Sequence, residues 1–453
     1  MSETSTRLLL LSAVVAMAGC AGEPSPSTSR DLSAGVPSGA TAFRMAQPHA
    51  AARADGSVVV VWGRVSPDGT ADVVFAALDG AGHLGTPRRV NPTAGSAVAG
   101  RQVGPRVRAL PSGRILVSWI DRSRDASGDV VLAYSDDDGK SFSSPTYVND
   151  DRASAGQEYH DVAALPDGSV IVAWLDERDA SSDDPNRKQV YTARSRDGGL
   201  SFERNRQVTE SPGGVCPCCR PSLSVHPDGT AHLVYRDRER DELVVRLRRA
   251  PLGGEFATAV DVPGARWRYS SCPVDGPTVV ATDSGALLVA WMDGAMLSER
   301  LWVVRSPDGR VFERRRELTV PTGEASARRA SLVFEERLGA VAAWEDTQGR
   351  IWVRRLEAEL ADSPVLLGGG EGALEARSVA LVAGRAAVHA FWIEEDVAAV
   401  LYGESDASAL PNSALSAVRH ARLVRNGDTV QVLKRDQASL LANQRRKAPR
   451  EVD

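Results

Sequence analysis

The sequence predicts an all-β fold, a β-propeller of four-stranded antiparallel blades, and two observations carry this prediction. The first is a short apolar strand that recurs seven times and ends in an aromatic residue, with a charged residue two places further on. The aromatic residues are Trp62, Trp119, Trp174, Tyr235, Trp291, Trp344 and Trp392. Successive copies lie 48 to 61 residues apart. A period of this size indicates an array of similar supersecondary units.

The second observation is that the copies have similar surroundings. A short apolar run and a turn, such as Pro166-Asp167-Gly168, precede the recurring strand, as is typical of a tight hairpin. A polar loop and a third apolar run follow it, and most copies add a fourth. Four short strands per repeat correspond to one propeller blade. We expect seven blades, with six as the alternative, because a closing blade shared by the two chain ends would change the count.

The first 40 residues differ from the repeats. An apolar run, Leu8 to Met17, is too short to span a bilayer and is typical of a signal peptide. It ends in small residues before Cys20 and so resembles a bacterial lipoprotein signal, in which Cys20 would carry the lipid. The alternative is an ordinary signal cleaved nearby. The lipoprotein interpretation implies an exported protein that is lipid-anchored in the bacterial cell envelope, on the periplasmic or surface side.

Four segments follow from these patterns. We expect a lipoprotein signal peptide over 1–19, a Ser/Pro/Gly-rich flexible tether over 20–40, the propeller over 41–435 and a polar tail over 436–453. The net charge is −5, and acidic and basic residues are interspersed along the chain. This pattern argues against nucleic acid as a partner, because a nucleic-acid-binding protein would have a basic surface. We expect a monomer whose only membrane contact is the lipid anchor.

A second motif follows the third strand of two successive repeats. It has the form Ser-x-Asp-x-Gly-x-x-Phe and comprises Ser135, Asp137, Gly139 and Phe142, then Ser195, Asp197, Gly199 and Phe202. It resembles the Asp-box, or BNR repeat, of the sialidase (neuraminidase) superfamily, and the resemblance covers roughly 43–402. The resemblance implies a propeller whose Asp-boxes are structural and lie on the face opposite the active site. They identify a fold and not a reaction.

Charged residues gather at one expected face of the propeller. One set follows the recurring aromatic residues, and another precedes the first strand of each blade. Together they give the expected ligand-binding face: Arg101, His160, Asp161, Asp237, Asp275 and Asp293. For the acidic residues the alternative is structural, with each Asp capping the backbone of its own loop. The arginines indicate an anionic ligand, because a guanidinium binds a carboxylate through two parallel hydrogen bonds.

The resemblance to sialidases implies three arginines on a sugar carboxylate, a Tyr nucleophile with a Glu partner, and an Asp as acid/base. Candidates for these roles are Arg44, Arg220, Arg328, Arg377, Tyr159, Tyr269 and Asp176. No Glu/Tyr pairing stands out, so the sequence does not establish catalysis. We therefore favour recognition of a glycan or other anionic ligand, with an exo-sialidase-type glycoside hydrolase as the alternative.

Four cysteines form a separate feature: Cys216, Cys218, Cys219 and Cys272. The segments CPCC and CPVDGP resemble those of a group of bacterial sialidase-like lipoproteins of undefined activity. In an exported protein, clustered thiols are usually oxidised. The pairing Cys216–Cys219 with Cys218–Cys272 avoids a bridge between adjacent residues. The alternative is a metal or thiol site, because four thiolates suit Zn²⁺ or Cu⁺. No other cofactor is expected.

Overall fold

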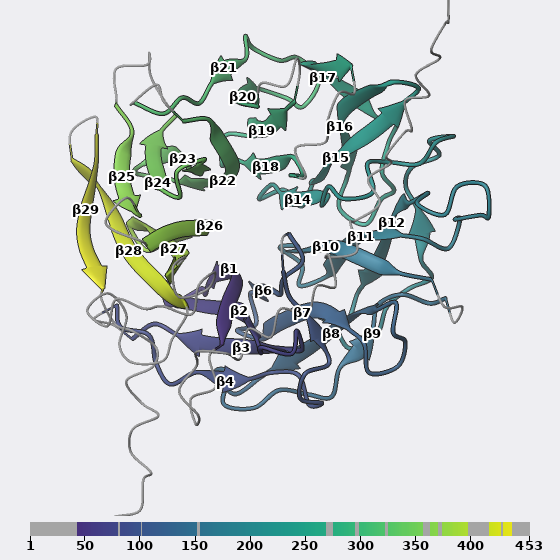
Figure 1. Ribbon diagram of the computed structural model, residues 1–453, viewed down its shortest axis with the longest axis horizontal. Coiled ribbons are helices and arrows are strands. Elements are labelled where there is room, and N and C mark those ends of the chain that lie inside the picture. The colour runs from purple at the N-terminus through teal and green to yellow at the C-terminus, as the bar shows by residue number, and fades with distance from the viewer. Residues whose placement is uncertain are drawn as a thin grey trace, which may run out of the picture.

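The computed structural model describes residues 43–79, 82–100, 102–151, 155–268, 275–294, 299–321, 325–356, 363–369, 374–396, 416–426 and 429–436. Within these ranges the secondary structure consists of β-strands and turns, with no helix. The described residues accordingly include no helix of the length and apolar character needed to cross a bilayer. The strands form one nine-stranded sheet and five four-stranded sheets (Figure 1).

The nine-stranded sheet holds the first part of the fold. Its strands are β1 (Arg44–Ala52), β2 (Val58–Val65), β3 (Ala71–Ala77), β4 (Arg88–Arg89), β5 (Ala97–Val98), β6 (Arg106–Ala109), β7 (Ile115–Asp121), β8 (Asp129–Ser135) and β9 (Thr146–Tyr147). The two-residue strand β5 pairs with both β3 and β7. It therefore links two sets of four strands, β1–β4 and β6–β9.

The other five sheets are consecutive antiparallel sets of four strands, paired in chain order. They are β10 (Gln157–Ala164), β11 (Val170–Asp176), β12 (Gln189–Ser195) and β13 (Arg206–Gln207); β14 (Ser222–Val225), β15 (Ala231–Glu239), β16 (Glu242–Ala250) and β17 (Val260–Arg268); β18 (Thr278–Ala281), β19 (Leu287–Asp293), β20 (Arg300–Ser306) and β21 (Arg316–Glu317); β22 (Ala327–Glu335), β23 (Gly339–Asp346), β24 (Ile351–Arg355) and β25 (Val365–Gly368); and β26 (Leu374–Gly384), β27 (Ala387–Asp396), β28 (Ser416–Asn426) and β29 (Thr429–Asp436).

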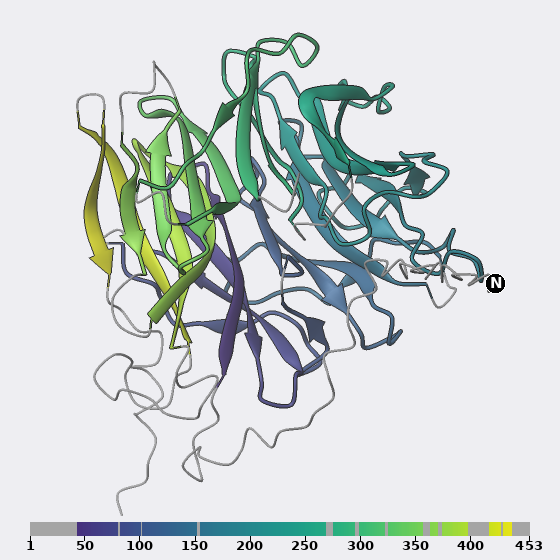
Figure 2. The same cartoon turned by 45° about the horizontal axis from the view of Figure 1, so that its top comes forward.

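The sheets stand radially around a common axis, as Figures 1 and 2 show from two directions. The first strand of each set lies nearest the axis, and these strands contact one another in the order β1, β6, β10, β14, β18, β22, β26 and back to β1. The ring is therefore closed between the first and last sheets. The predicted all-β propeller of four-stranded antiparallel sheets is confirmed.

Hydrophobic clusters fill the spaces between neighbouring sheets. At the closure, Val60 and Trp62 of β2 pack with Phe391 and Ile393 of β27. The recurring aromatic residues are almost fully buried, and Trp174 has no exposed surface. Burying one large apolar side chain stabilises the fold by about 1.5–3 kcal/mol. The repeated aromatic residue thus serves inter-sheet packing.

The acidic residue two places after the aromatic one is also structural. Asp176 accepts a hydrogen bond from Trp174 Nε1 at 2.7 Å and another from the backbone N of Arg178 at 2.9 Å. Asp121 receives the equivalent bonds from Trp119 Nε1 and the backbone N of Ser123. Each carboxylate ties its strand to the following loop, which is the alternative that the sequence offered for the acidic set.

The Asp-box side chains hold the turns between third and fourth strands. Ser135 Oγ donates to Asp137 and accepts from Gly139 N, and Gly139 takes a φ of +79° that few other residues adopt. Phe142 packs edge-to-face on Phe75 of the preceding set of strands. The second box repeats these bonds with Ser195, Asp197 and Gly199, and Phe202 packs into the adjoining core.

A β-bulge recurs in the innermost strands. The register shifts within β1, β10, β22 and β26. At each bulge one non-glycine residue has a positive φ: Gln47 at 45°, Tyr159 at 53°, Arg329 at 45° and Ser378 at 58°. Such backbone costs about 1–3 kcal/mol per residue and is concentrated at functional sites. Bulges re-aim side chains, and here they do so around the propeller axis.

Candidate ligand site in the central channel

A cavity of about 450 Å³ lies between the innermost strands, within the size range of small-molecule sites. It is lined by residues from all seven sets of strands. The polar side chains among them are Gln47, His49, Gln102, Arg106, Arg108, Asp161, Arg220, Ser222, Ser224, Asp275, Thr278, Arg329, Ser331, Glu345 and Ser378. Four arginines therefore face three carboxyl groups in this channel.

Asp161 anchors two of the arginines. Its carboxylate lies 3.6 Å from Arg106 Nε and 3.4 Å from Arg108 Nη2, and it accepts bonds from the backbone N of Leu223 and Val162. Burial raises the pKa of Asp161, although Arg108 and the backbone donors oppose this. Arg108 Nη1 also lies 2.9 Å from His49 Nε2. Burial, with Arg108 and Arg220 nearby, lowers the pKa of His49, so this imidazole is neutral at pH 7.

Arg220 occupies a different environment. It lies deep in the protein but keeps a partly exposed surface on the channel. Burial lowers the pKa of Arg220 to about 10, an effect that Asp275 opposes, so the guanidinium is charged at pH 7. Its Nη1 donates to the backbone O of Gln102 at 3.4 Å. Among the ion pairs between described residues, none includes Arg220.

Asp275 and Glu345 complete the charged lining. Glu345 is bound by Arg329 and by the backbone N of Ser378, while burial raises its pKa. Asp275 is 8 % exposed, and burial raises its pKa to about 6, against the attraction of Arg329, Arg236 and Arg220. Near neutral pH the channel consequently has a positive excess.

Several predicted residues lie elsewhere. Arg44 and Arg377 both pair with buried Glu395, on the rim between the first and last sheets, and Arg328 pairs with Glu299 at 2.7 Å. None of these three arginines lines the channel cavity. Their charges are balanced by protein carboxylates, so the structure does not bring the predicted triad together around Arg220.

The predicted nucleophile and acidic residues also have structural partners. Tyr159 packs between two hydrophobic clusters beside the cysteines, and burial raises the pKa of its hydroxyl. His160 is buried with Nε2 at 2.9 Å from Ser118 Oγ, and its pKa falls to about 4 because of burial. Asp237 pairs with Arg246, and Asp293 accepts from Trp302 Nε1. Cys20, Arg101, Tyr269 and Cys272 lie outside the described residues.

Sequence reasoning selected Arg220, Asp161 and Asp275 for the functional face, and all three line the channel. It did not identify Gln102, Arg108 or Glu345 as members of this face. One signal for Glu345 was available: the position directly after the recurring aromatic residue is apolar or glycine in five copies, whereas Arg236 and Glu345 occupy it in the other two. Both are buried, at 1 % and 4 % exposure.

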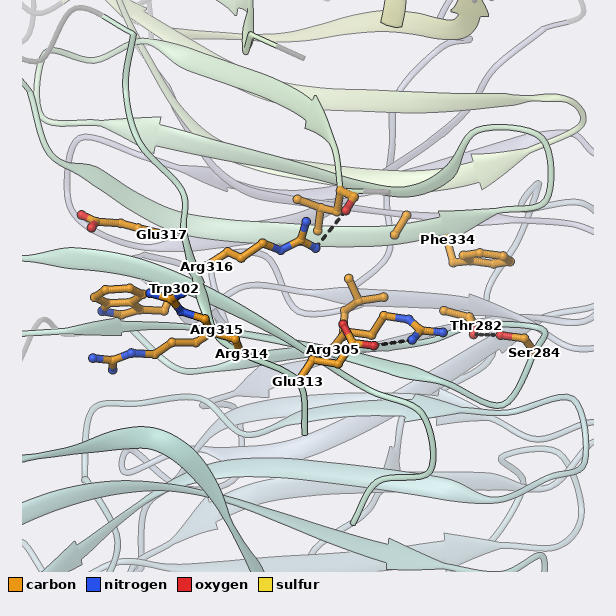
Figure 3. A pocket seen from close by; sticks show the side chains of 13 residues that line it. Thr282, Ser284, Trp302, Arg305, Glu313, Arg314, Arg315, Arg316, Glu317 and Phe334 are labelled. Atoms are coloured by element: carbon orange, nitrogen blue, oxygen red, sulfur yellow. Dashed lines mark hydrogen bonds and ion pairs between the residues drawn. The ribbon is translucent and has the colours of Figure 1, made fainter. Parts of the chain in front are cut away.

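A larger cleft of about 890 Å³ lies between the sheets β18–β21 and β22–β25 (Figure 3). Arg305, Arg314, Arg315 and Arg316 line it. Three of them are engaged within the protein: Arg305 pairs with Glu313, Arg316 donates to the backbone O of Leu356, and Arg315 stacks over Trp302. The central channel, with charged side chains held at depth, is therefore the stronger candidate site.

The cysteines form a compact group in the loop before β14. The Sγ atoms of Cys216 and Cys219 are 3.0 Å apart, and those of Cys216 and Cys218 are 3.8 Å apart. A disulfide requires about 2.05 Å, so the predicted Cys216–Cys219 bond is not formed in this structure.

No family model and no curated protein matches this chain. Solved structures do, among them an α-L-arabinanase of Penicillium chrysogenum complexed with arabinobiose, at 16 % identity over 67 % of this chain and 92 % of the other, with a TM-score of 0.46. An intramolecular trans-sialidase of Ruminococcus gnavus complexed with oseltamivir carboxylate has 11 % identity, over 67 % and 90 %, with a TM-score of 0.44.

A protein of unknown function from Dyadobacter fermentans is also similar, at 15 % identity over 78 % of this chain and 90 % of the other, with a TM-score of 0.46. Sialidases, the family that the Asp-boxes resemble, are thus among the structural neighbours. The chain is a β-propeller with a charged central channel.

Proposed function

We propose that this protein is an envelope-anchored propeller that recognises a glycan or another ligand bearing a carboxylate, bound in the central channel. The observation that carries the proposal is the position of Arg220. A charged guanidinium at this depth costs free energy unless an anion accompanies it. A ligand carboxylate would supply that anion through two charge-assisted hydrogen bonds.

The surrounding groups support the same ligand chemistry. Arg108 and Arg329 flank the channel with their carboxylate partners already in place, so their positions are fixed before a ligand arrives. The neutral His49 and the amides of Gln47 and Gln102 add uncharged polar groups of the kind that orient a sugar. Preorganised donors lower the entropic cost of binding.

Hydrolysis by an exo-sialidase-type mechanism is the second candidate. It is favoured by Asp275, whose pKa of about 6 suits a proton donor near neutral pH. A sialidase-type reaction also needs a tyrosine nucleophile, and the hydroxyl of Tyr159 is packed beside the cysteines with a raised pKa. Recognition therefore stands ahead of hydrolysis.

Arg220→Met is expected to weaken binding of N-acetylneuraminate by about 10- to 100-fold, because a hydrogen bond to a charged group contributes about 1.5–3 kcal/mol. Isothermal titration calorimetry on the soluble form that starts after Cys20 measures this. Arg268→Met is the matched control, since that arginine is exposed and pairs only with exposed Asp241 in the structure. Equal affinity of the Arg220 variant and the wild type would contradict the proposal.

Release of N-acetylneuraminate from a fluorogenic sialoside, lost in Asp275→Asn, would favour hydrolysis instead.

The proposal includes export and anchoring, with the signal peptide over 1–19, the tether over 20–40 and a lipid on Cys20. Cys20→Ser is expected to move the protein from the membrane fraction to the soluble fraction, because stable anchoring depends on the acyl chains. Immunoblotting of fractionated cells measures the distribution. Ser25→Ala in the tether is the control, and an unchanged membrane fraction for Cys20→Ser would refute the anchor.

We further infer a monomer of seven blades. This count treats the nine-stranded sheet as two blades, β1–β4 and β6–β9. It is supported by the hydrophobic clusters, each of which joins one set of four strands to the next around the ring.

A further inference from the structure

Three cysteines next to Arg220 form a group of possible metal ligands. The Sγ atoms of Cys216, Cys218 and Cys219 all lie within 4.8 Å of one another. In a tetrahedral zinc site with Zn–S bonds of about 2.3 Å, two sulfurs are about 3.8 Å apart. The separation of Cys216 and Cys218 is 3.8 Å, and the 3.0 Å between Cys216 and Cys219 needs to widen by less than about 1 Å.

The backbone holds these sulfurs in place. Val215 forms an isolated bridge with Asp237, and the backbone N of Cys216 donates to the O of Arg236 at 3.0 Å. The start of the cysteine loop is therefore paired to β15. Cys216 and Cys219 are each 1 % exposed within the hydrophobic cluster between β14–β17 and β18–β21, while Cys218 is half-buried at its edge. An ion could enter past Cys218.

A buried arginine accompanies the sulfurs. Arg236 is 1 % exposed, and its Nη1 lies 3.0 Å from Cys219 Sγ. Its Nη2 donates to the O of Met292 at 2.7 Å, and its guanidinium stacks on Trp267. These contacts hold the guanidinium of Arg236 against the cysteine sulfurs. Three thiolates (−3), one Zn²⁺ (+2) and Arg236 (+1) sum to zero, which removes most of the cost of placing charge in apolar surroundings.

We propose that Cys216, Cys218 and Cys219 bind one Zn²⁺ through three thiolates, with Arg236 as the neutralising cation. Thiolate sulfur suits this borderline-soft ion, and a zinc ion bound by three thiolates takes water or a further donor as its fourth ligand. The site is distinct from the carboxylate site at Arg220, so metal loading and anion binding are separate measurements. It also gives the CPCC segment a role other than the disulfide.

The metal content of the purified soluble form tests this site. Protein prepared with Zn²⁺ and then dialysed is expected to hold one zinc per chain by inductively coupled plasma mass spectrometry. Cys216→Ser and Cys219→Ser are expected to lower this at least tenfold, because each removes a ligand from a three-thiolate set. Val279→Ala is the control, since it perturbs the same hydrophobic cluster without removing a sulfur. Wild-type protein without zinc, or cysteine variants that retain it, would overturn the proposal.

A second measurement requires no variant and so does not depend on whether a variant folds. Iodoacetamide labelling of the native protein, read by peptide mass spectrometry, is expected to slow at least tenfold at half-buried Cys218 when Zn²⁺ is added and to recover with a chelator. Labelling that zinc does not change would overturn the site. So would a Cys216–Cys219 disulfide in protein purified without reductant.

Discussion

Asp275→Asn is expected to stabilise the protein by about 3 kcal/mol at pH 8 and to change its stability little at pH 4. The pKa of Asp275 is about 6 in the folded state and 3.8 without the fold. The difference of about two units corresponds to about 3 kcal/mol, because each unit represents about 1.4 kcal/mol. The folded carboxyl binds its proton more tightly than the unfolded one. The ionised Asp275 therefore destabilises the folded protein by the full amount above pH 6, and this destabilisation disappears as the pH falls from about 6 to 3.8.

The difference in stability between Asp275→Asn and the wild type reports on the Asp275 carboxyl alone. His49 and His160 have lowered pKa values, so both proteins lose stability as these imidazoles are forced to protonate below about pH 6.5. That loss cancels in the difference. Urea unfolding at pH 8, 6 and 4 gives the free energies of unfolding. Asp283→Asn, at an exposed turn, serves as the control and is expected to change stability by less than about 0.5 kcal/mol. A stabilisation that grows as the pH falls would contradict the assignment.

The physical cause of this cost bears on function. Arg220, Arg236, Arg329 and Glu345 are the charged groups that act on Asp275, and they come from four different segments of the ring. The three arginines favour the ionised carboxylate, yet burial outweighs them. A channel that retains a costly carboxyl beside Arg220 has the composition expected of a site selected for ligand contact, because function commonly opposes stability at such positions.

The propeller could be predicted because its signals are local and repeated. Trp174 and Asp176, for example, are two residues apart, and the hydrogen bond between their side chains joins two residues of the same strand. The same bond forms in other strands from the same spacing. Packing of the aromatic residue against a neighbouring sheet then requires only that the units be arranged side by side. Periodicity therefore determines this part of the fold.

The channel was only partly predictable because bulges set its geometry. Arg328 and Arg329 are adjacent, yet the positive φ of Arg329 sends its guanidinium to Glu345, while Arg328 pairs with Glu299. Which of the two adjacent arginines reaches the channel depends on backbone angles that the amino-acid composition does not reveal. The pairing of Arg44 with Glu395 likewise joins the first and last sheets across 351 positions. Such contacts follow from ring closure and not from any local pattern.

Gly276→Ala is expected to weaken N-acetylneuraminate binding by about 100-fold, or about 2.7 kcal/mol, and to destabilise the fold by about 1–3 kcal/mol. A Cβ at Gly276 would lie 2.1 Å from the backbone O of Arg220 and 2.8 Å from its backbone N. Both atoms belong to the main chain, so no side-chain rotation relieves the overlap. The segment carrying Asp275 and the segment carrying Arg220 must therefore move apart.

That movement would break the bonds that position the channel. Gln102 Oε1 accepts from the backbone N of Gly276 at 3.0 Å and from that of Arg220 at 3.5 Å, so one amide holds both segments. Calorimetric titration and urea unfolding measure the two effects on one sample. Gly100→Ala is the matched control, because a Cβ there meets nothing within 4 Å and its φ is not positive. Wild-type affinity in a stably folded Gly276→Ala protein would show that the ligand does not use the Arg220 guanidinium as positioned here, since displacement of its backbone would otherwise carry it out of reach.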